Sequence, residues 1–236
     1  MTKGKLTMKY FSFIRKEYRF FIFICVAIVI LLCLFNLAST ITNIPVNLFT
    51  RDPASIMLEK GVFSSNLAPL IGSLSHIGII LWCVSASICI FASCLLTQKE
   101  PVELYSRSQK SRYFLIYFGA FTSILLLDDL FLLHEEVVTI IFPQNVTYIF
   151  YLSISLFGIF KFWNTILTTE WPILCVGISF LLISVLMDIT HVPIRFVEPI
   201  LLEDGFKLLG IASWCTYFVL SAFQFVHMPT DKPNLY

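Results

Sequence analysis

Two adjacent carboxylates, Asp128 and Asp129, interrupt an apolar run that resumes at Leu130 and ends at His134. If this run crosses a membrane, the pair lies within the apolar layer, where ionisable side chains are costly and usually face a bundle interior or a watery cavity. A carboxylate in such a place can act as a general base, bind a metal ion or carry a proton. Asp128 and Asp129 are therefore candidate catalytic residues, and the alternative is a structural polar contact between helices.

Histidines near the ends of apolar runs supply candidate metal ligands. Asp188 and His191 are i, i+3 neighbours, so both lie on one face of a helix, where they can bind one metal ion or hydrogen-bond to each other. His76 is the only His, Asp, Glu, Lys or Arg in the stretch 70–97. Together with His134, these residues form the expected ligand set of a divalent metal such as zinc: His76, His134, Asp188 and His191.

Glu203 and Lys207 form a second candidate pair. They are i, i+4 neighbours in the order that favours an ion pair on a helix, and Pro199 is expected as the first residue of that helix. Two glycines bracket Lys207 and permit a neighbouring helix to approach closely. This segment could bring a positive charge to the acidic cluster, so Glu203 and Lys207 join the candidate catalytic residues. The alternative is the ordinary placement of acids near a helix amino end.

The composition identifies the environment that must position these side chains. Of the 236 residues, 58% are hydrophobic and only 13% are charged, whereas soluble domains are about 45–50% apolar and about 25% charged. The formal net charge of +1 argues against nucleic acid as a partner, because such a partner requires a strongly basic face. The chain is therefore expected to be an integral membrane protein with the lipid bilayer as its first partner.

Six apolar stretches approach the length of about 20 residues that a membrane-spanning helix needs. They are continuous rather than alternating, which favours helices over a lipid-facing barrel. The expected fold is an all-α polytopic bundle of about six transmembrane helices, at about 20–38, 72–97, 113–133, 147–164, 171–189 and 206–226.

The distribution of charge predicts the orientation of these spans. With the amino terminus in the cytoplasm, 12 of the 16 Lys and Arg residues fall on the inner side, as the positive-inside rule requires. The basic segment 1–19 and the tail 228–236 are therefore expected in the cytoplasm, and the membrane is the plasma membrane if the source is bacterial. Ten of the 15 acids and three of the four histidines fall on the opposite side, which predicts an outward-facing acidic and histidine-bearing cluster.

The first functional hypothesis is a metal-dependent membrane hydrolase that acts on a lipid or lipid-like substrate. In residue types alone, the set resembles that of the alkaline ceramidase and adiponectin receptor group, which are membrane hydrolases that hold zinc with three histidines beside Ser and Asp. This chain lacks a paired H-x-x-x-H on a late helix, has Ser73 three rather than four residues before His76, and is expected to have six spans instead of seven. It is not assigned to that group.

Two hypotheses from other classes remain open. A proton-coupled transporter or channel subunit could use the carboxylates and Lys207 as a relay, and a chain of this length would then need a second copy, which predicts a homodimer. A non-catalytic membrane assembly or sensory protein could use the same charges to hold its helices together.

Overall fold

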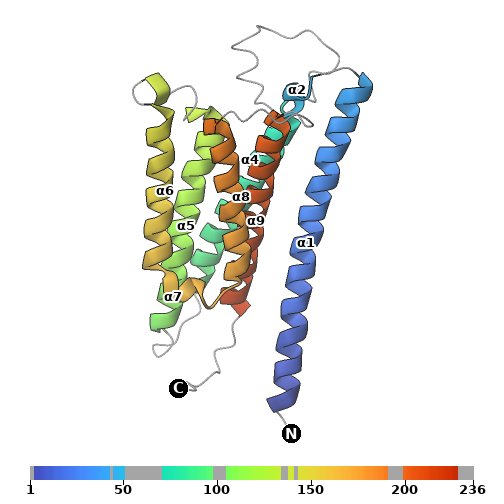
Figure 1. Cartoon of the computed structure of the whole chain (residues 1–236). Helices are drawn as coiled ribbons and strands as arrows, with labels where there is room; N and C mark the ends of the chain where they lie inside the picture. The colour runs from blue at the N-terminus through green and yellow to red at the C-terminus, as the bar shows by residue number, and fades with distance from the viewer. Residues whose placement is uncertain are drawn as a thin grey trace. The chain divides into compact units, whose positions relative to one another are not determined.

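A computed structural model of the chain describes seven ranges, which are residues 3–42, 45–50, 71–97, 105–133, 138–140, 143–190 and 199–227. Within these ranges the chain forms helices and no strand (Figure 1). Five helices are long and apolar enough to cross a membrane, with candidate spans Tyr18–Ile41, Ser73–Leu96, Ser108–Phe131, Trp171–Thr190 and Ile200–His227. The predicted all-α membrane fold is confirmed.

The long helices follow the predicted stretches and mostly extend beyond them. They are α1 (Lys3–Thr42), α4 (Ser73–Thr97), α5 (Tyr105–Phe131), α8 (Trp171–Thr190) and α9 (Pro199–His227). Pro199 is the first residue of α9, as predicted, because its fixed φ suits a helix start and its missing N–H is not needed there. Short elements complete the described part: α2 (Asn47–Thr50), η3 (Val138–Ile140) and α7 (Trp163–Ile166).

The stretch predicted as a span at 147–164 forms α6 (Gln144–Lys161), which has 18 residues and begins and ends three residues earlier than expected. Its apolar part is Val146–Lys161. The helix ends because Phe162 leaves the helical conformation, with φ −107° and ψ 18°, although its N–H still donates to the Gly158 carbonyl. Eighteen helical residues rise about 27 Å, slightly less than the apolar layer of about 30 Å.

The chain divides into two compact units. Unit 1 comprises Met1–Gly78 and Cys175–Trp214, and unit 2 comprises Ile79–Leu174 and Cys215–Tyr236. The boundaries fall inside α4, α8 and α9, so these helices contribute residues to both units.

In unit 1, α8 and α9 approach closely because glycines lie where they cross. A Cβ atom added to Gly177 on α8 would lie 3.1 Å from Ser213 Cβ and 3.2 Å from the Trp214 nitrogen on α9. A Cβ atom added to Gly210 on α9 would lie 2.7 Å from Leu181 Cγ and 3.0 Å from the Leu181 nitrogen on α8. Small residues at helix crossings permit this approach, and close packing holds helices together in lipid.

The helix α1 packs in unit 1 through one face. Phe21 and Ile28 are buried. Leu32 Cδ1 lies 3.0 Å from the position that a Cβ atom on Gly205 of α9 would take. The Phe35 ring lies 5.4 Å from that of Phe49 on α2. Steps of three, four and seven residues keep these side chains on one side of the helix.

In unit 2, aromatic rings from α5 form the core. Phe114 and Phe118 are fully buried, and the Phe114 ring lies 5.7–5.9 Å from the rings of Phe162, Phe218 and Phe225. Aromatic pairs at such separations bury large apolar areas and fix ring orientation.

Hydrogen bonds fix the neighbours of α5 in the same unit. The Tyr117 hydroxyl donates to the Ile154 carbonyl of α6 at 2.7 Å. The carboxyl-terminal part of α9 is joined to the segment after α7, since Tyr217 and Thr169 hydroxyls lie 2.8 Å apart and Gln224 Nε2 donates to the Thr168 carbonyl at 2.9 Å.

The glycine crossing in unit 1 can be tested with two alanine substitutions. Gly210→Ala should lower the free energy of unfolding by about 1–3 kcal/mol, because the new methyl group meets backbone as well as side-chain atoms of Leu181. Gly78→Ala is the matched control, since its methyl group would meet only the flexible Cδ1 of Ile211, at 3.3 Å. The control should be neutral or stabilising by up to about 1 kcal/mol, the helix propensity gained. Unfolding in detergent measures both, and equal effects would contradict the close crossing.

Candidate functional site

The Asp128–Asp129 pair lies two and three residues before the end of α5 at Phe131. The helix stops because Leu132 adopts φ 50°, the left-handed conformation that ends many helices but is rarely adopted by leucine. The Leu132 side chain is nevertheless buried. Successive residues on a helix point about 100° apart, so the two carboxylates face different neighbours.

Asp129 is hydrogen-bonded to α4. Trp82 Nε1 donates to Asp129 Oδ2 at 2.8 Å. The Trp82 side chain is buried, and a buried indole N–H usually has an acceptor. This contact joins α4 to the end of α5.

Asp128 is hydrogen-bonded to α6. The Tyr151 hydroxyl donates to the Asp128 carboxyl group, and only 4% of the Asp128 surface is exposed. A carboxyl group this deeply buried needs hydrogen-bond donors to offset its lost hydration. We call these four residues, Trp82, Asp128, Asp129 and Tyr151, the polar bridge.

The polar bridge connects three helices of unit 2 through their side chains. Its geometry is that of a structural contact, because each carboxyl group receives a hydrogen bond from an aromatic side chain on a different helix. These contacts fit the structural alternative for the aspartate pair, and its catalytic role stays a prediction.

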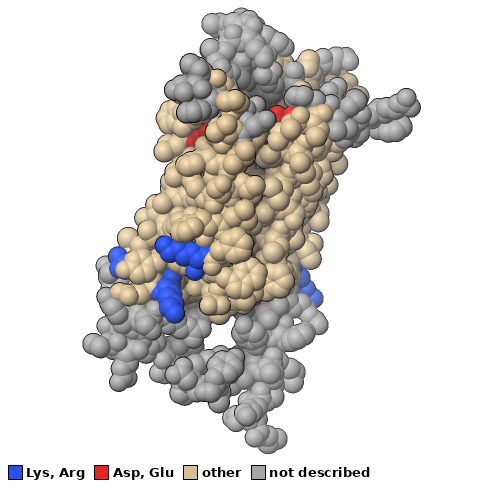
Figure 2. Space-filling view, turned by 60° about the vertical axis from the view of Figure 1, so that its left-hand side comes forward, with Lys and Arg blue, Asp and Glu red and all other residues tan. Residues whose placement is uncertain are grey.

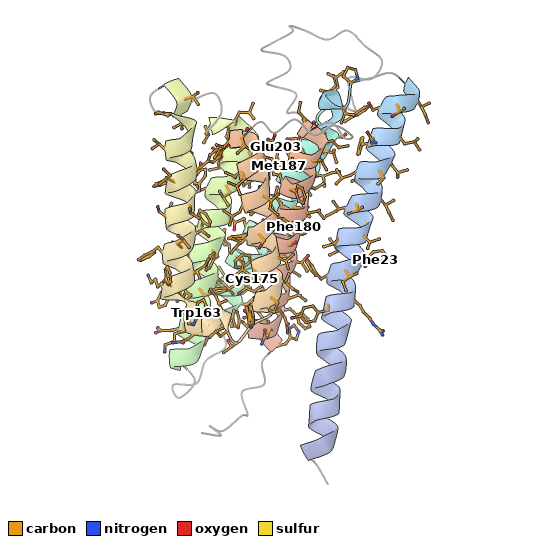
Figure 3. All side chains as sticks on the ribbon, viewed as in Figure 1. Phe23, Trp163, Cys175, Phe180, Met187 and Glu203 are labelled. Atoms are coloured by element: carbon orange, nitrogen blue, oxygen red, sulfur yellow. The ribbon has the colours of Figure 1, made fainter. Side chains whose placement is uncertain are left out.

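The other candidate residues that the structure describes lie in unit 1. Asp188 is near the end of α8, and Glu203 and Lys207 are in the first turns of α9. All three side chains are half-buried. Figure 3 shows Glu203 and Met187, the residue before Asp188, at the same end of these two helices.

The histidines predicted as metal ligands are only partly described. His76 lies in the first turn of α4, with an exposed side chain. His134 and His191 lie outside the described residues. Among the residues that the structure does describe, no group of three or more His, Cys, Asp or Glu side chains is arranged to hold a metal ion. The metal site stays a prediction.

Neither Tyr151 nor Trp82 is among the candidate residues that the sequence analysis names. One sequence signal could have drawn attention to both. Each is an aromatic residue with a polar tip in the middle of an apolar helix, and such a tip needs a hydrogen-bond partner.

A comparison with protein families assigns the chain to one family. The family described as "Domain of unknown function (DUF8692)" matches residues 21–221, which is more than half of the chain. The chain belongs to this family. No curated protein and no solved structure matches it. The DUF8692 range contains the whole polar bridge and all the candidate residues.

The Trp82–Asp129 contact of this DUF8692 protein can be tested by a double-mutant cycle. Trp82→Phe should lower the free energy of unfolding by about 1–2 kcal/mol, because it removes the donor to a partly buried carboxyl group. Combined with Asp129→Asn, the cycle should give a coupling energy of about 0.5–2 kcal/mol. Trp171→Phe is the control, since this exposed tryptophan should change stability by less than about 0.5 kcal/mol. A coupling energy of zero would show that the hydrogen bond does not stabilise the protein.

Proposed function

We propose that the protein is a non-catalytic membrane assembly protein, a helical bundle whose outer helix faces bind other helices in the bilayer. The observation that carries this proposal is the polar bridge. Intramembrane carboxylates usually mark a substrate path or proton relay, but here both are engaged by donors on neighbouring helices and Asp128 is buried. These contacts support a structural role for the most conspicuous candidate catalytic residues.

The outer face of α1 supplies a surface for assembly. Phe23, Val26, Ile30, Cys33 and Leu37 are all exposed, and Figure 3 labels Phe23 on this helix. They recur at alternating steps of three and four residues, the 3.5-residue period of a seam that packs against an identical helix. This face is opposite to the one that packs within unit 1, because Phe21 and Phe23 are separated by about 200°. The proposed partner is therefore α1 of a second copy, which gives a homodimer.

Cys33 makes the proposed homodimer testable because it is one of the seam residues. Mild oxidation of the protein in its native membrane should produce a disulfide-linked dimer at twice the monomer mass of 27.1 kDa. Cys33→Ser should abolish the cross-link. Cys83→Ser should leave it intact, since Cys83 is also exposed but lies on α4. The change Ile30→Trp in a Cys33-containing chain should weaken the cross-link several-fold, because the larger ring would hold the two helices apart at the seam.

Two results would contradict the assembly proposal. The first is the absence of a Cys33-dependent dimer in the membrane. The second is metal chemistry: elemental analysis of the purified protein should find no stoichiometric metal. Near-stoichiometric zinc that disappears in both His76→Ala and His191→Ala, with folding retained, would favour the metal-dependent hydrolase instead.

We also propose that α6 crosses the membrane, which gives six spans with both termini in the cytoplasm. Two observations support this. The first is the position of the basic residues: Lys161 is the last residue of α6, and Lys110 and Arg112 are in the first turns of α5. The second is the pairing of the two helices, since the Tyr117–Ile154 and Phe114–Phe162 contacts fit an antiparallel arrangement of α5 and α6. Basic residues at the same end of both helices are expected on the inner side. In a bacterium the membrane would be the plasma membrane.

The orientation can be measured with reporters fused to each end of the chain. A reporter that is active only in the cytoplasm should be active when it is fused to the amino terminus and when it is fused to the carboxyl terminus. A reporter placed in the segment 134–137, between α5 and η3, should respond as an outer one. If the two termini report opposite sides of the membrane, the chain crosses an odd number of times and α6 does not span it.

A further inference from the structure

Basic side chains gather at one end of unit 2, away from its aspartate pair. Lys110 and Arg112 lie in the first turns of α5, and Lys161 ends α6. Figure 2 shows Lys and Arg side chains together toward one end of the face in view, with uncharged surface beyond them. Arg112 and Asp128 are separated by about 24 Å of helix rise, so the aspartate pair does not neutralise this end. The described acid nearest in sequence to Lys161 is Glu170, after α7, and one carboxylate does not balance three cations.

Arg112 offers a hydrogen-bond donor that the described part of the protein does not use. Its side chain is half-buried, and its Nε atom is buried without a hydrogen-bond partner in that part. A guanidinium group has a fixed fork of donors that fits the oxygen atoms of carboxylate or phosphate groups. The hydrogen bonds within the described part therefore leave this guanidinium group with donor capacity, which an oxyanion beside α5 could use.

Lys161 is positioned by two aromatic rings. Its Nζ atom lies 5.6 Å from the centroid of the Phe157 ring and 5.6 Å from that of the Phe162 ring. These cation–π contacts restrict the ammonium group near the α6–α7 junction, although the residue itself is exposed. Because α5, α6 and α7 contact one another, Lys161 and the start of α5 belong to one corner of unit 2.

The surroundings of this corner are those of a membrane interface. Tyr113 and Trp163 are exposed beside the basic residues, and Figure 3 shows Trp163 at the end of α6. Tyr and Trp are enriched at the depth of lipid headgroups. Exposed apolar side chains of α6, Phe157 and Phe160, continue from the corner along the helix, where acyl chains would lie.

We propose that this corner binds an anionic phospholipid. Its headgroup phosphate accepts hydrogen bonds from Arg112 and lies close to Lys161, while Lys110 adds to the positive potential. The tail lies along the exposed face of α6. A lipid fits better than a free oxyanion, because the charged corner is continuous with an apolar surface. The proposal is independent of the assembly proposal, since it uses neither the polar bridge nor α1.

Lipid competition in detergent tests this inference. The full-length protein is equilibrated with equal amounts of phosphatidylglycerol and phosphatidylcholine, and the lipids that stay bound are measured by native mass spectrometry. The wild type should retain phosphatidylglycerol in preference. Arg112→Gln and Lys161→Gln should each reduce this preference about fivefold, the change expected for losing one basic contact at the membrane surface. Lys161→Gln covers the case in which Arg112→Gln fails to fold, because Lys161 is exposed.

Arg19→Gln is the matched control, since Arg19 is an arginine near the start of an apolar helical segment and is exposed like Lys161, but belongs to α1 in unit 1. It should leave the lipid preference unchanged. An equal loss in this control would overturn the proposal, because it would show that only the general surface charge matters. Unchanged preference in both corner variants would overturn it as well. So would displacement of the lipid by millimolar inorganic phosphate, because the site would then bind the free ion.

Discussion

The need of a carboxyl group for hydrogen-bond donors in an apolar bundle determines the arrangement of α4, α5 and α6. Water satisfies Asp and Glu in a soluble protein, but within a bundle the donors must come from the protein itself. Asp128 and Asp129 are consecutive on one helix, so they point in directions about 100° apart and need donors from two different neighbours. Trp82 and Tyr151 are those donors. A rotation of α5 about its axis would break both contacts at once, so the pair fixes which face of α5 meets which helix.

The two units use different means to hold their helices together. In unit 1, the α8–α9 crossing depends on Gly177 and Gly210, whose missing side chains let the backbones approach. In unit 2, the core of α5 consists of phenylalanine rings with hydrogen bonds at its edges. Both arrangements follow from the same constraint. Lipid is as apolar as the side chains, so hydrophobic burial does little to drive helices together, and close packing and hydrogen bonds must do so.

The sequence was sufficient to predict the fold class and the start of α9 at Pro199, because apolar run length and proline geometry are local properties. It was less accurate for the 147–164 stretch, where Phe162 ends the helix and no local signal marks that position. The contacts of the candidate site were harder to predict from the sequence than the helix ends. The aspartates were identified because a charge in an apolar run is visible, but their partners are 47 residues away for Trp82 and 23 for Tyr151, and such pairings are set by packing. The predicted metal-ligand set stays a prediction for a different reason, because His134 and His191 lie outside the described residues.

The charges of α5 are divided between its two ends, and this division connects its polar contacts to its place in the bilayer. Arg112 and Lys110 lie near the amino end, and Asp128 and Asp129 near the carboxyl end. This order opposes the helix dipole, which favours acids at the amino end and bases at the carboxyl end. The order must therefore be maintained by other interactions. The polar bridge provides them for the aspartates, and an anionic headgroup would provide them for Arg112, whose Nε has no partner in the described part of the protein. A helix whose basic end is stabilised by lipid and whose acidic end is stabilised by protein is thereby fixed in both depth and direction.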